Sequence, residues 1–109
     1  MFLGLCSVDV EPVWHLYVIV VDHRDALLEH LANNHISAGI HYPSAIPQLG
    51  AYNEIAHFCS KCPESIRRAK KMISLPIYPE LTLDQQDYIV SKIREFFSKP
   101  QTEFPQSVP

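Results

Sequence analysis

The fold is decided by Val13-Trp14-His15-Leu16-Tyr17-Val18-Ile19-Val20-Val21. Most of these side chains are β-branched or aromatic, and such residues favour an extended backbone. Apolar residues run almost without interruption, as is typical of a strand covered on both faces of a sheet. The sequence therefore predicts a central strand over residues 14–21.

A helix near residues 24–34 is predicted directly after this strand. Asp22 suits the N-cap position, and Asp25 suits the first turn. Apolar side chains then recur at helical spacing, at Leu27, Leu28, Leu31 and Ala32. Asn33-Asn34 tolerates the left-handed conformation that often ends a helix.

The next segment alternates between extended and irregular structure. Residues 36–42 predict a second short strand that stops at Pro43. Residues 43–62 predict an irregular loop, with a turn of helix around 48–56. Pro63 suits the first position of a helix over residues 63–72, and prolines favour an extended piece over residues 74–79.

The last predicted element is a helix over residues 82–98. Thr82-x-x-Gln85 has the pattern of a capping box, in which the two side chains satisfy N-terminal backbone groups. The inward faces of this helix and of the first one are predicted to comprise Leu27, Leu28, Leu31, Ile89, Ile93 and Phe97. The order of elements predicts a two-layer α+β domain over residues 13–99, with an irregular segment 1–12 before it and a loose tail 100–109 after it.

Composition excludes several classes of function. A chain of 109 residues with 47% hydrophobic residues suits one domain with one core. Its three widely separated glycines exclude a Gly-rich phosphate loop, and a net charge of −3 argues against a nucleic-acid partner. The basic run Arg67, Arg68, Lys70, Lys71 is interpreted as a solvated helix face.

No apolar stretch approaches the roughly 20 residues of a membrane span. Three cysteines without a secretion signal favour the cytoplasm.

His41 and Tyr42 are the candidate binding residues. They end the predicted strand 36–42 and precede a proline-containing loop. Site residues gather at such strand ends in α/β architectures. A histidine and a tyrosine there can hydrogen-bond a polar ligand or move protons near neutral pH.

No metal site and no catalytic residue is predicted. Cys59-Ser60-Lys61-Cys62, with His57 upstream, has the spacing of a redox or zinc motif. A structural zinc site needs four ligands, however, and no second pair exists, so we interpret the cysteines as incidental. None of the five lysines stands in apolar surroundings that would lower its pKa for covalent catalysis.

Several motifs occur here in the order found in one known family. They are Val13-Trp14-His15-Leu16-Tyr17-Val18-Ile19, Arg24-Asp25-x-Leu27, Gly39-Ile40-His41-Tyr42-Pro43, Ala51-Tyr52, Ser74-Leu75-Pro76-Ile77-Tyr78-Pro79 and Leu81-Thr82. Over residues 13–98 the chain resembles the C-terminal, small domain of DegT/StrS-type sugar-nucleotide aminotransferases. These are pyridoxal-phosphate enzymes with the aspartate-aminotransferase fold, known as fold type I.

The resemblance implies a transferase ancestry in polysaccharide biosynthesis. The family transfers an amino group to a keto sugar that is linked to a nucleotide, and His41 and Tyr42 match a substrate-facing stretch. This sequence departs from the family's Pro-x-His-x-Gln pattern, because Pro47 and Leu49 stand at the histidine and glutamine positions. The large domain with its pyridoxal-phosphate lysine has no counterpart in this sequence.

Two interpretations follow from this resemblance. In the first, the chain is a small-domain fragment that needs a large-domain partner or self-associates through the face carrying Tyr42, Pro43 and the loop 44–58. That face is expected to line a cleft that the large domain closes. In the second, the chain is a stand-alone, non-catalytic interaction or ligand-binding module. In both, we expect this chain alone to be inactive and to bind no pyridoxal phosphate.

Overall fold

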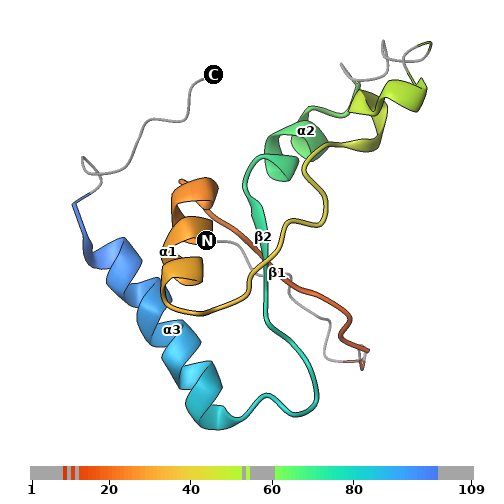
Figure 1. The fold of residues 1–109 in the computed structure, drawn as a ribbon. Helices are drawn as coiled ribbons and strands as arrows, with labels where there is room; N and C mark the ends of the chain where they lie inside the picture. Colours follow the sequence, from red (N-terminus) through yellow and green to blue (C-terminus); the bar gives the residue numbers. More distant parts are fainter. Residues whose placement is uncertain (1–8, 10, 12, 53, 55–60, 101–109) are drawn as a thin grey trace.

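The computed structural model describes residues 9, 11, 13–52, 54 and 61–100. Along the chain the elements are β1 (Tyr17–Val20), α1 (Arg24–Asn33), the 3-10 helix η1 (Ile46–Gln48), α2 (Pro63–Ala69), β2 (Met72–Leu75) and α3 (Leu83–Ser98). Figure 1 shows α1 and α3 beside the two strands, with α2 and the segment before it extending away from them. The expected α+β composition is confirmed.

The sheet is smaller than the sequence predicts, and β1 lies at its edge. β1 pairs antiparallel with β2 in a register that places Tyr17 opposite Leu75 and Ile19 opposite Ile73. On the other side of β2, Gly39 forms a single bridge to Ser74. Among the described strands β2 is therefore flanked on both sides, and the prediction of a central strand over 14–21 is wrong.

The physical reason is visible at the start of the predicted strand. Val13 is 97% exposed and Trp14 is 54% exposed, so these apolar side chains do not face a core. Continuous hydrophobicity in this stretch reflects outward-facing residues as well as buried ones. The predicted strand 36–42 likewise shrinks to the bridge at Gly39, and the strand that does form, β2, begins at Met72, where the sequence predicted the end of a helix.

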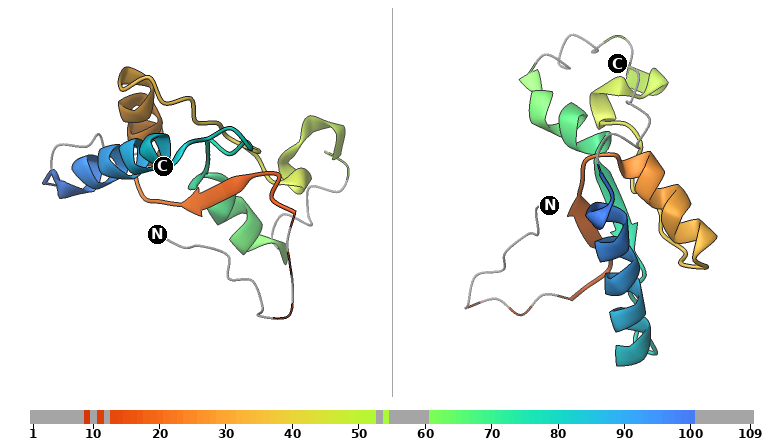
Figure 2. Two further views of the ribbon diagram at one scale, coloured as in Figure 1. Left: turned by 90° about the horizontal axis from the view of Figure 1, so that it is seen from below. Right: turned by 90° about the vertical axis from the view of Figure 1, so that its left-hand side faces the viewer.

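The core lies between one face of the sheet and the helices α1 and α3. Residues directly opposite each other in an antiparallel pair share a face, so Ile19 and Ile73 point the same way. Figure 2 shows both helices on the same side of the sheet. The buried members of the core include Ile19, Leu27, Leu31, Ile73, Ile89 and Phe96.

One predicted core residue of α3 is replaced by its neighbour. Ile89 is buried and Ile93 packs against the core, as predicted, but Phe97 is 37% exposed whereas Phe96 is 2% exposed. Consecutive residues lie about 100° apart around an α-helix. The positions 89, 93 and 96 therefore continue one stripe, and Phe97 lies beside it.

Helix α1 forms at nearly the predicted residues, but other residues than those predicted cap its two ends. Its N-cap is His23, in the left-handed conformation, whereas the predicted cap Asp22 pairs with Lys71. At the C-terminal end the left-handed residue is His35, one position beyond the predicted Asn33-Asn34. The amide of His35 bonds to the carbonyl of Ala32, and the amide of Ile36 bonds to that of Leu31. This pattern is a Schellman motif, and it buries Ile36 against the core.

The start of α3 is as predicted. The hydroxyl of Thr82 accepts a hydrogen bond from the amide of Gln85, and the side chain of Gln85 accepts one from the amide of Thr82. The capping box therefore forms in full. Helix α2 begins at Pro63 as predicted but ends at Ala69, because Met72 belongs to β2.

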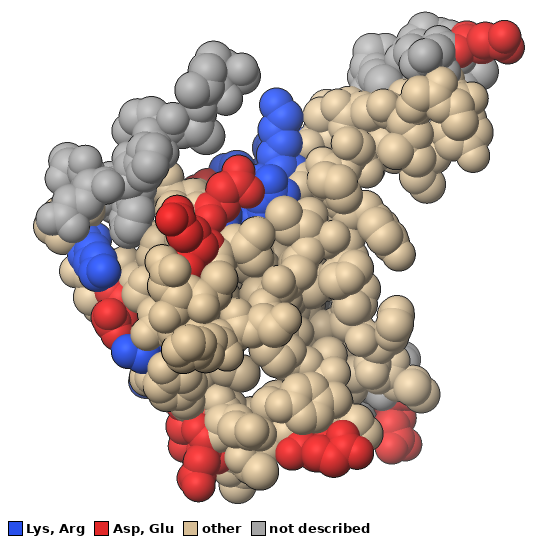
Figure 3. Space-filling model, in the orientation of Figure 1, with Lys and Arg blue, Asp and Glu red and all other residues tan. Residues whose placement is uncertain are grey.

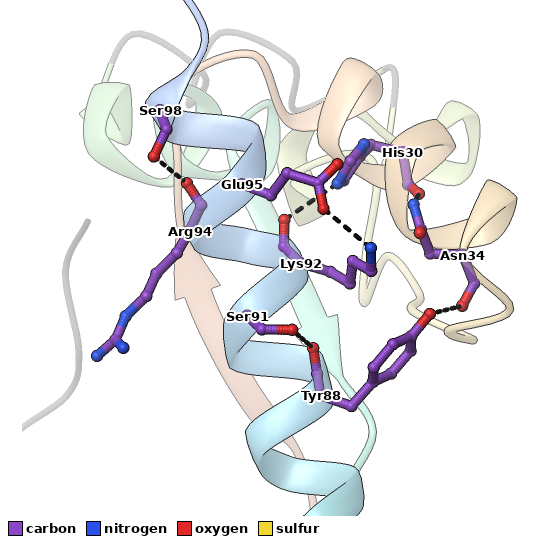
Figure 4. A network of polar contacts seen from close by, with 8 residues as sticks. All are labelled: His30, Asn34, Tyr88, Ser91, Lys92, Arg94, Glu95 and Ser98. Atoms are coloured by element: carbon purple, nitrogen blue, oxygen red, sulfur yellow. Dashed lines mark hydrogen bonds and ion pairs between the residues drawn. The ribbon is translucent and has the colours of Figure 1, made fainter.

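Polar contacts join α1 to α3 along their shared side (Figure 4). The ring nitrogen Nε2 of His30 lies 3.0 Å from the carbonyl oxygen of Lys92. The Tyr88 hydroxyl donates to the carbonyl oxygen of Asn34 at 3.3 Å. These two contacts tie α3 to α1 and to its C-cap residue Asn34. No helix within the described residues is long and apolar enough to cross a membrane.

Candidate functional site

The candidate residue His41 is anchored to the sheet through Ser74. Gly39 and Ser74 exchange two backbone hydrogen bonds, of 3.0 and 2.8 Å, which hold this segment against β2. The ring nitrogen Nδ1 of His41 lies 2.9 Å from the Oγ of Ser74, a side chain that is 4% exposed. Ser74 is adjacent in β2 to the core residue Ile73, so it points to the opposite face of the sheet. His41 therefore lies on the face that α1 and α3 do not cover.

Gly39 makes room for the imidazole ring. A Cβ atom at this position would lie 2.9 Å from the Cε1 of His41, closer than carbon atoms normally approach. The absence of a side chain at Gly39 thus allows the ring to fold back over the backbone and reach Ser74. The glycine two residues before His41 is visible in the sequence. Nothing in the sequence pattern, however, indicates that His41 contacts Ser74.

Tyr42 projects into solvent next to His41. It is 72% exposed, and its ring meets the imidazole edge to face, with centroids 5.7 Å apart. Other exposed apolar side chains follow in the described part of the loop, at Ile46, Leu49 and Tyr52. We call Tyr42, Ile46, Leu49 and Tyr52 the loop patch. The loop patch is an exposed apolar surface on the described part of the face where the sequence predicts a contact with a large domain or a second copy.

A groove lies elsewhere, on the side of the sheet that faces α3. Its volume is about 460 Å³, and its lining includes Trp14, Tyr17, Leu75, Tyr78, Ile89 and Val90. Neither His41 nor Tyr42 lines it, so a cleft at those two residues stays a prediction. The sequence did not predict the groove, because Trp14 and Tyr17 were interpreted as parts of a buried strand.

Charge is sparse around the sheet. Figure 3 shows a face whose centre is mostly uncharged, with acidic side chains along its lower edge and both acidic and basic side chains along its upper and left parts. Of the basic run, only Arg67 and Arg68 lie in α2. A Glu64 carboxylate oxygen lies 2.7 Å from the guanidinium of Arg67 and 3.6 Å from that of Arg68. The hydrogen bond from Arg67 lowers the pKa of Glu64. The two arginines agree with a solvated helix face, whereas Lys70 and Lys71 follow the end of α2, so the prediction that the whole run lies on one helix is wrong.

The lysines of this chain, all of which the structure describes, do not fit a covalent pyridoxal-phosphate site. A lysine that binds the cofactor covalently needs a lowered pKa, which burial or neighbouring cations provide. None of the five lysines is buried. The hydrogen bond to Glu95 raises the pKa of Lys92, which is the opposite direction, and Lys71 pairs with Asp22. We therefore derive no chemical step through this cofactor.

Metal binding finds no support in the described residues. They contain no group of three or more His, Cys, Asp or Glu side chains arranged to hold a metal ion. Cys62 is a free thiol at the N-cap of α2. Its predicted companions His57 and Cys59 lie outside the described residues, as do most of the segment 1–12 and residues 101–109.

The class of structure found here is a small α+β unit in which two helices pack on one face of an antiparallel sheet. His41 and Tyr42 follow the segment that bridges to β2 on the side opposite β1. Residues 5–94 match the DegT/DnrJ/EryC1/StrS aminotransferase family, and the chain belongs to this family. Aminotransferases of this kind generally use pyridoxal phosphate.

Individual relatives agree with this assignment. The chain is 34% identical over 85 residues to a pleiotropic regulatory protein of Geobacillus stearothermophilus, covering 78% of this chain and 23% of that protein. It is 32% identical over 94 residues to dTDP-3-amino-3,4,6-trideoxy-alpha-D-glucose transaminase of Streptomyces venezuelae, covering 86% and 25%.

A solved structure of the same family has a similar fold. It is a DegT DnrJ EryC1 StrS aminotransferase from Brucella abortus, with a TM-score of 0.67 and 29% identity, covering 79% of this chain and 23% of that one. The chain thus spans about a quarter of the length of the relatives it matches.

Proposed function

We propose that this chain is the C-terminal, small-domain segment of a nucleotide-sugar aminotransferase. The observation that carries the proposal is the family match over residues 5–94, which corresponds to only a quarter of the length of the relatives. A two-layer unit of this size supplies walls and contacts to a site. It does not contain the groups that hold the cofactor.

The groups that hold pyridoxal phosphate belong, in this proposal, to a separate large domain. The absence of a buried lysine and the raised pKa of Lys92 support this division. The complete enzyme would aminate a keto sugar linked to a nucleotide, as the name of the Streptomyces venezuelae transaminase suggests for that protein. We place it in the cytoplasm, where nucleotide-linked sugars for polysaccharide biosynthesis would be modified.

His41 and Tyr42 are proposed to face the substrate, and the loop patch is proposed to meet the large domain. The bond to Ser74 orients the imidazole, and Tyr42 is exposed enough to contact a second surface. The side chains of Pro47 and Leu49 cannot form the hydrogen bonds that the family's histidine and glutamine can form at these positions. His41 and Tyr42 would therefore contribute more to sugar recognition in this chain than in those relatives.

A complementation experiment tests the proposal. The Streptomyces venezuelae transaminase without its matching segment would be mixed with this chain, and transaminase activity measured. We expect activity to be recovered, to fall with Tyr42→Lys, and to persist with Leu83→Lys. Leu83 is 77% exposed at the start of α3, so it controls for adding a lysine at an exposed apolar site.

Two outcomes would contradict the proposal. Equal activity of the Tyr42→Lys and Leu83→Lys mixtures would remove Tyr42 from the interface. No recovery with any family large domain, together with saturable binding of a nucleotide sugar by the chain alone, would instead support an independent binding module.

A further inference from the structure

The outer edge of β1 carries backbone groups that are unpaired among the described residues. The amide and carbonyl of Ser74 bond to Gly39, so they point away from β1. In an antiparallel ladder, hydrogen-bonded and non-hydrogen-bonded pairs alternate. Because Val18 lies opposite Ser74, Val18 belongs to a non-hydrogen-bonded pair, and its own amide and carbonyl point outward.

The same alternation applies along the rest of β1. The amide of Val21 bonds to the carbonyl of Lys71 at 3.0 Å, so Tyr17, Ile19 and Val21 point their backbone groups toward β2. Val18 and Val20 point theirs outward. In the described part of the chain, no backbone hydrogen bond joins this outer edge to another segment.

In residues 13–52 and 61–100, this edge lacks the features that usually prevent strands from pairing between molecules. Natural edge strands are protected by lysine, proline, bulges or a covering segment. Residues 13–21 contain no charged residue and no proline. The first charged side chain after the strand, Asp22, is held by Lys71. Two such strands can therefore meet without bringing like charges together, although the whole chain has a net charge of −3.

Apolar surface adjoins the edge. Tyr17, the first residue of β1, is 36% exposed, and Trp14, three residues before the strand, is 54% exposed; their ring centroids are 6.3 Å apart. Both line the groove of about 460 Å³, together with the half-exposed Val90 of α3. A molecule that pairs with β1 would cover these side chains as well as the backbone.

We propose that a second copy of this chain pairs with β1, antiparallel and about a two-fold axis. The edge is self-complementary, because Val18 of one copy and Val20 of the other both point a donor and an acceptor outward. With the axis at Ile19, these residues form two equivalent hydrogen-bonded pairs, as an isologous interface requires. The two sheets then become one continuous four-stranded sheet, and the loop patch stays free.

Hydrogen exchange of the unmodified chain tests this pairing directly. At high protein concentration the amides of Val18 and Val20 should gain protection of about tenfold or more over the dilute sample. Those of Ile19 and Val21 bond to β2 in both states and should not change. Equal exchange of Val18 and Val20 at both concentrations would overturn the proposal.

Sedimentation of variants provides the second test. Val18→Pro removes an outward amide that β2 does not use, and Tyr17→Lys adds a charge beside the edge. Both should shift the dimer to monomer, whereas Tyr42→Lys, on the loop patch, should leave it dimeric. A monomeric wild type, or a dimer that only Tyr42→Lys dissociates, would refute pairing through β1. The second result would assign self-association to the loop patch.

Discussion

Replacement of Phe96 by alanine should destabilise the chain far more than the same change at Phe97. The two residues are adjacent in α3 and chemically identical, but Phe96 is 2% exposed and belongs to the core, whereas Phe97 is 37% exposed. They therefore form a matched pair that differs mainly in burial.

The expected magnitudes follow from that difference. Burying a phenylalanine side chain contributes about 1.5–3 kcal/mol from transfer alone, and the cavity raises the cost of Phe96→Ala to about 3–5 kcal/mol. Phe97→Ala loses partial burial and an edge-to-face contact with Phe96, whose centroid is 5.1 Å away. We expect about 1 kcal/mol there. Because a domain of this size has a total stability of about 5–15 kcal/mol, the first change removes a large fraction.

Urea unfolding followed by far-ultraviolet circular dichroism measures both values. Equal slopes of the unfolding free energy against urea would show that the variants unfold from comparable states. A cost at Phe97 equal to or larger than that at Phe96 would refute the assigned core face of α3.

Three further changes probe local features. Thr82→Ala removes the capping box and should lower stability by about 1 kcal/mol, whereas Thr82→Ser should retain most of it in thermal unfolding. The hydrogen bond with Lys71 lowers the pKa of Asp22, so the pair's stabilisation is present at neutral pH and is lost as the pH falls below about 4. Asp22→Asn should reduce the fall in unfolding free energy between neutral and acidic pH by at most about 1 kcal/mol. If the unfolding free energy of the variant depends on pH as that of the wild type does, the ion pair with Lys71 is excluded. Ser74→Ala should cost about 1 kcal/mol and change the ring NMR signals of His41; unchanged signals would contradict the Ser74 contact.

The helices were predictable because their signals are local. The apolar stripe of α1 and the Thr82–Gln85 capping box lie within a few residues of one another, and both helices form with nearly the predicted bounds. The left-handed residue at the end of α1 was missed by one position, because the Schellman motif is closed by the burial of Ile36, a contact with the core.

The sheet was less predictable because strand pairing is not local. Hydrophobicity alone does not distinguish a central strand from an edge strand that exposes its aromatic residues, and β1 is of the second kind. The same ambiguity concealed the groove beside Trp14 and Tyr17. For the candidate site, the sequence indicated His41 and Tyr42 from their position at a strand end. The Ser74 hydroxyl that orients His41 lies 33 residues away, and only the folded sheet brings the two together.

The proposal that this chain depends on a separate large domain for its cofactor is tested most directly by borohydride reduction with pyridoxal phosphate, followed by peptide mapping. The chain would be treated alone and in the presence of a family large domain. We predict that alone it shows only scattered, substoichiometric labelling of its exposed lysines, and that in the mixture one lysine of the large domain is labelled stoichiometrically. A single lysine of this chain labelled stoichiometrically in the absence of a partner would contradict the account.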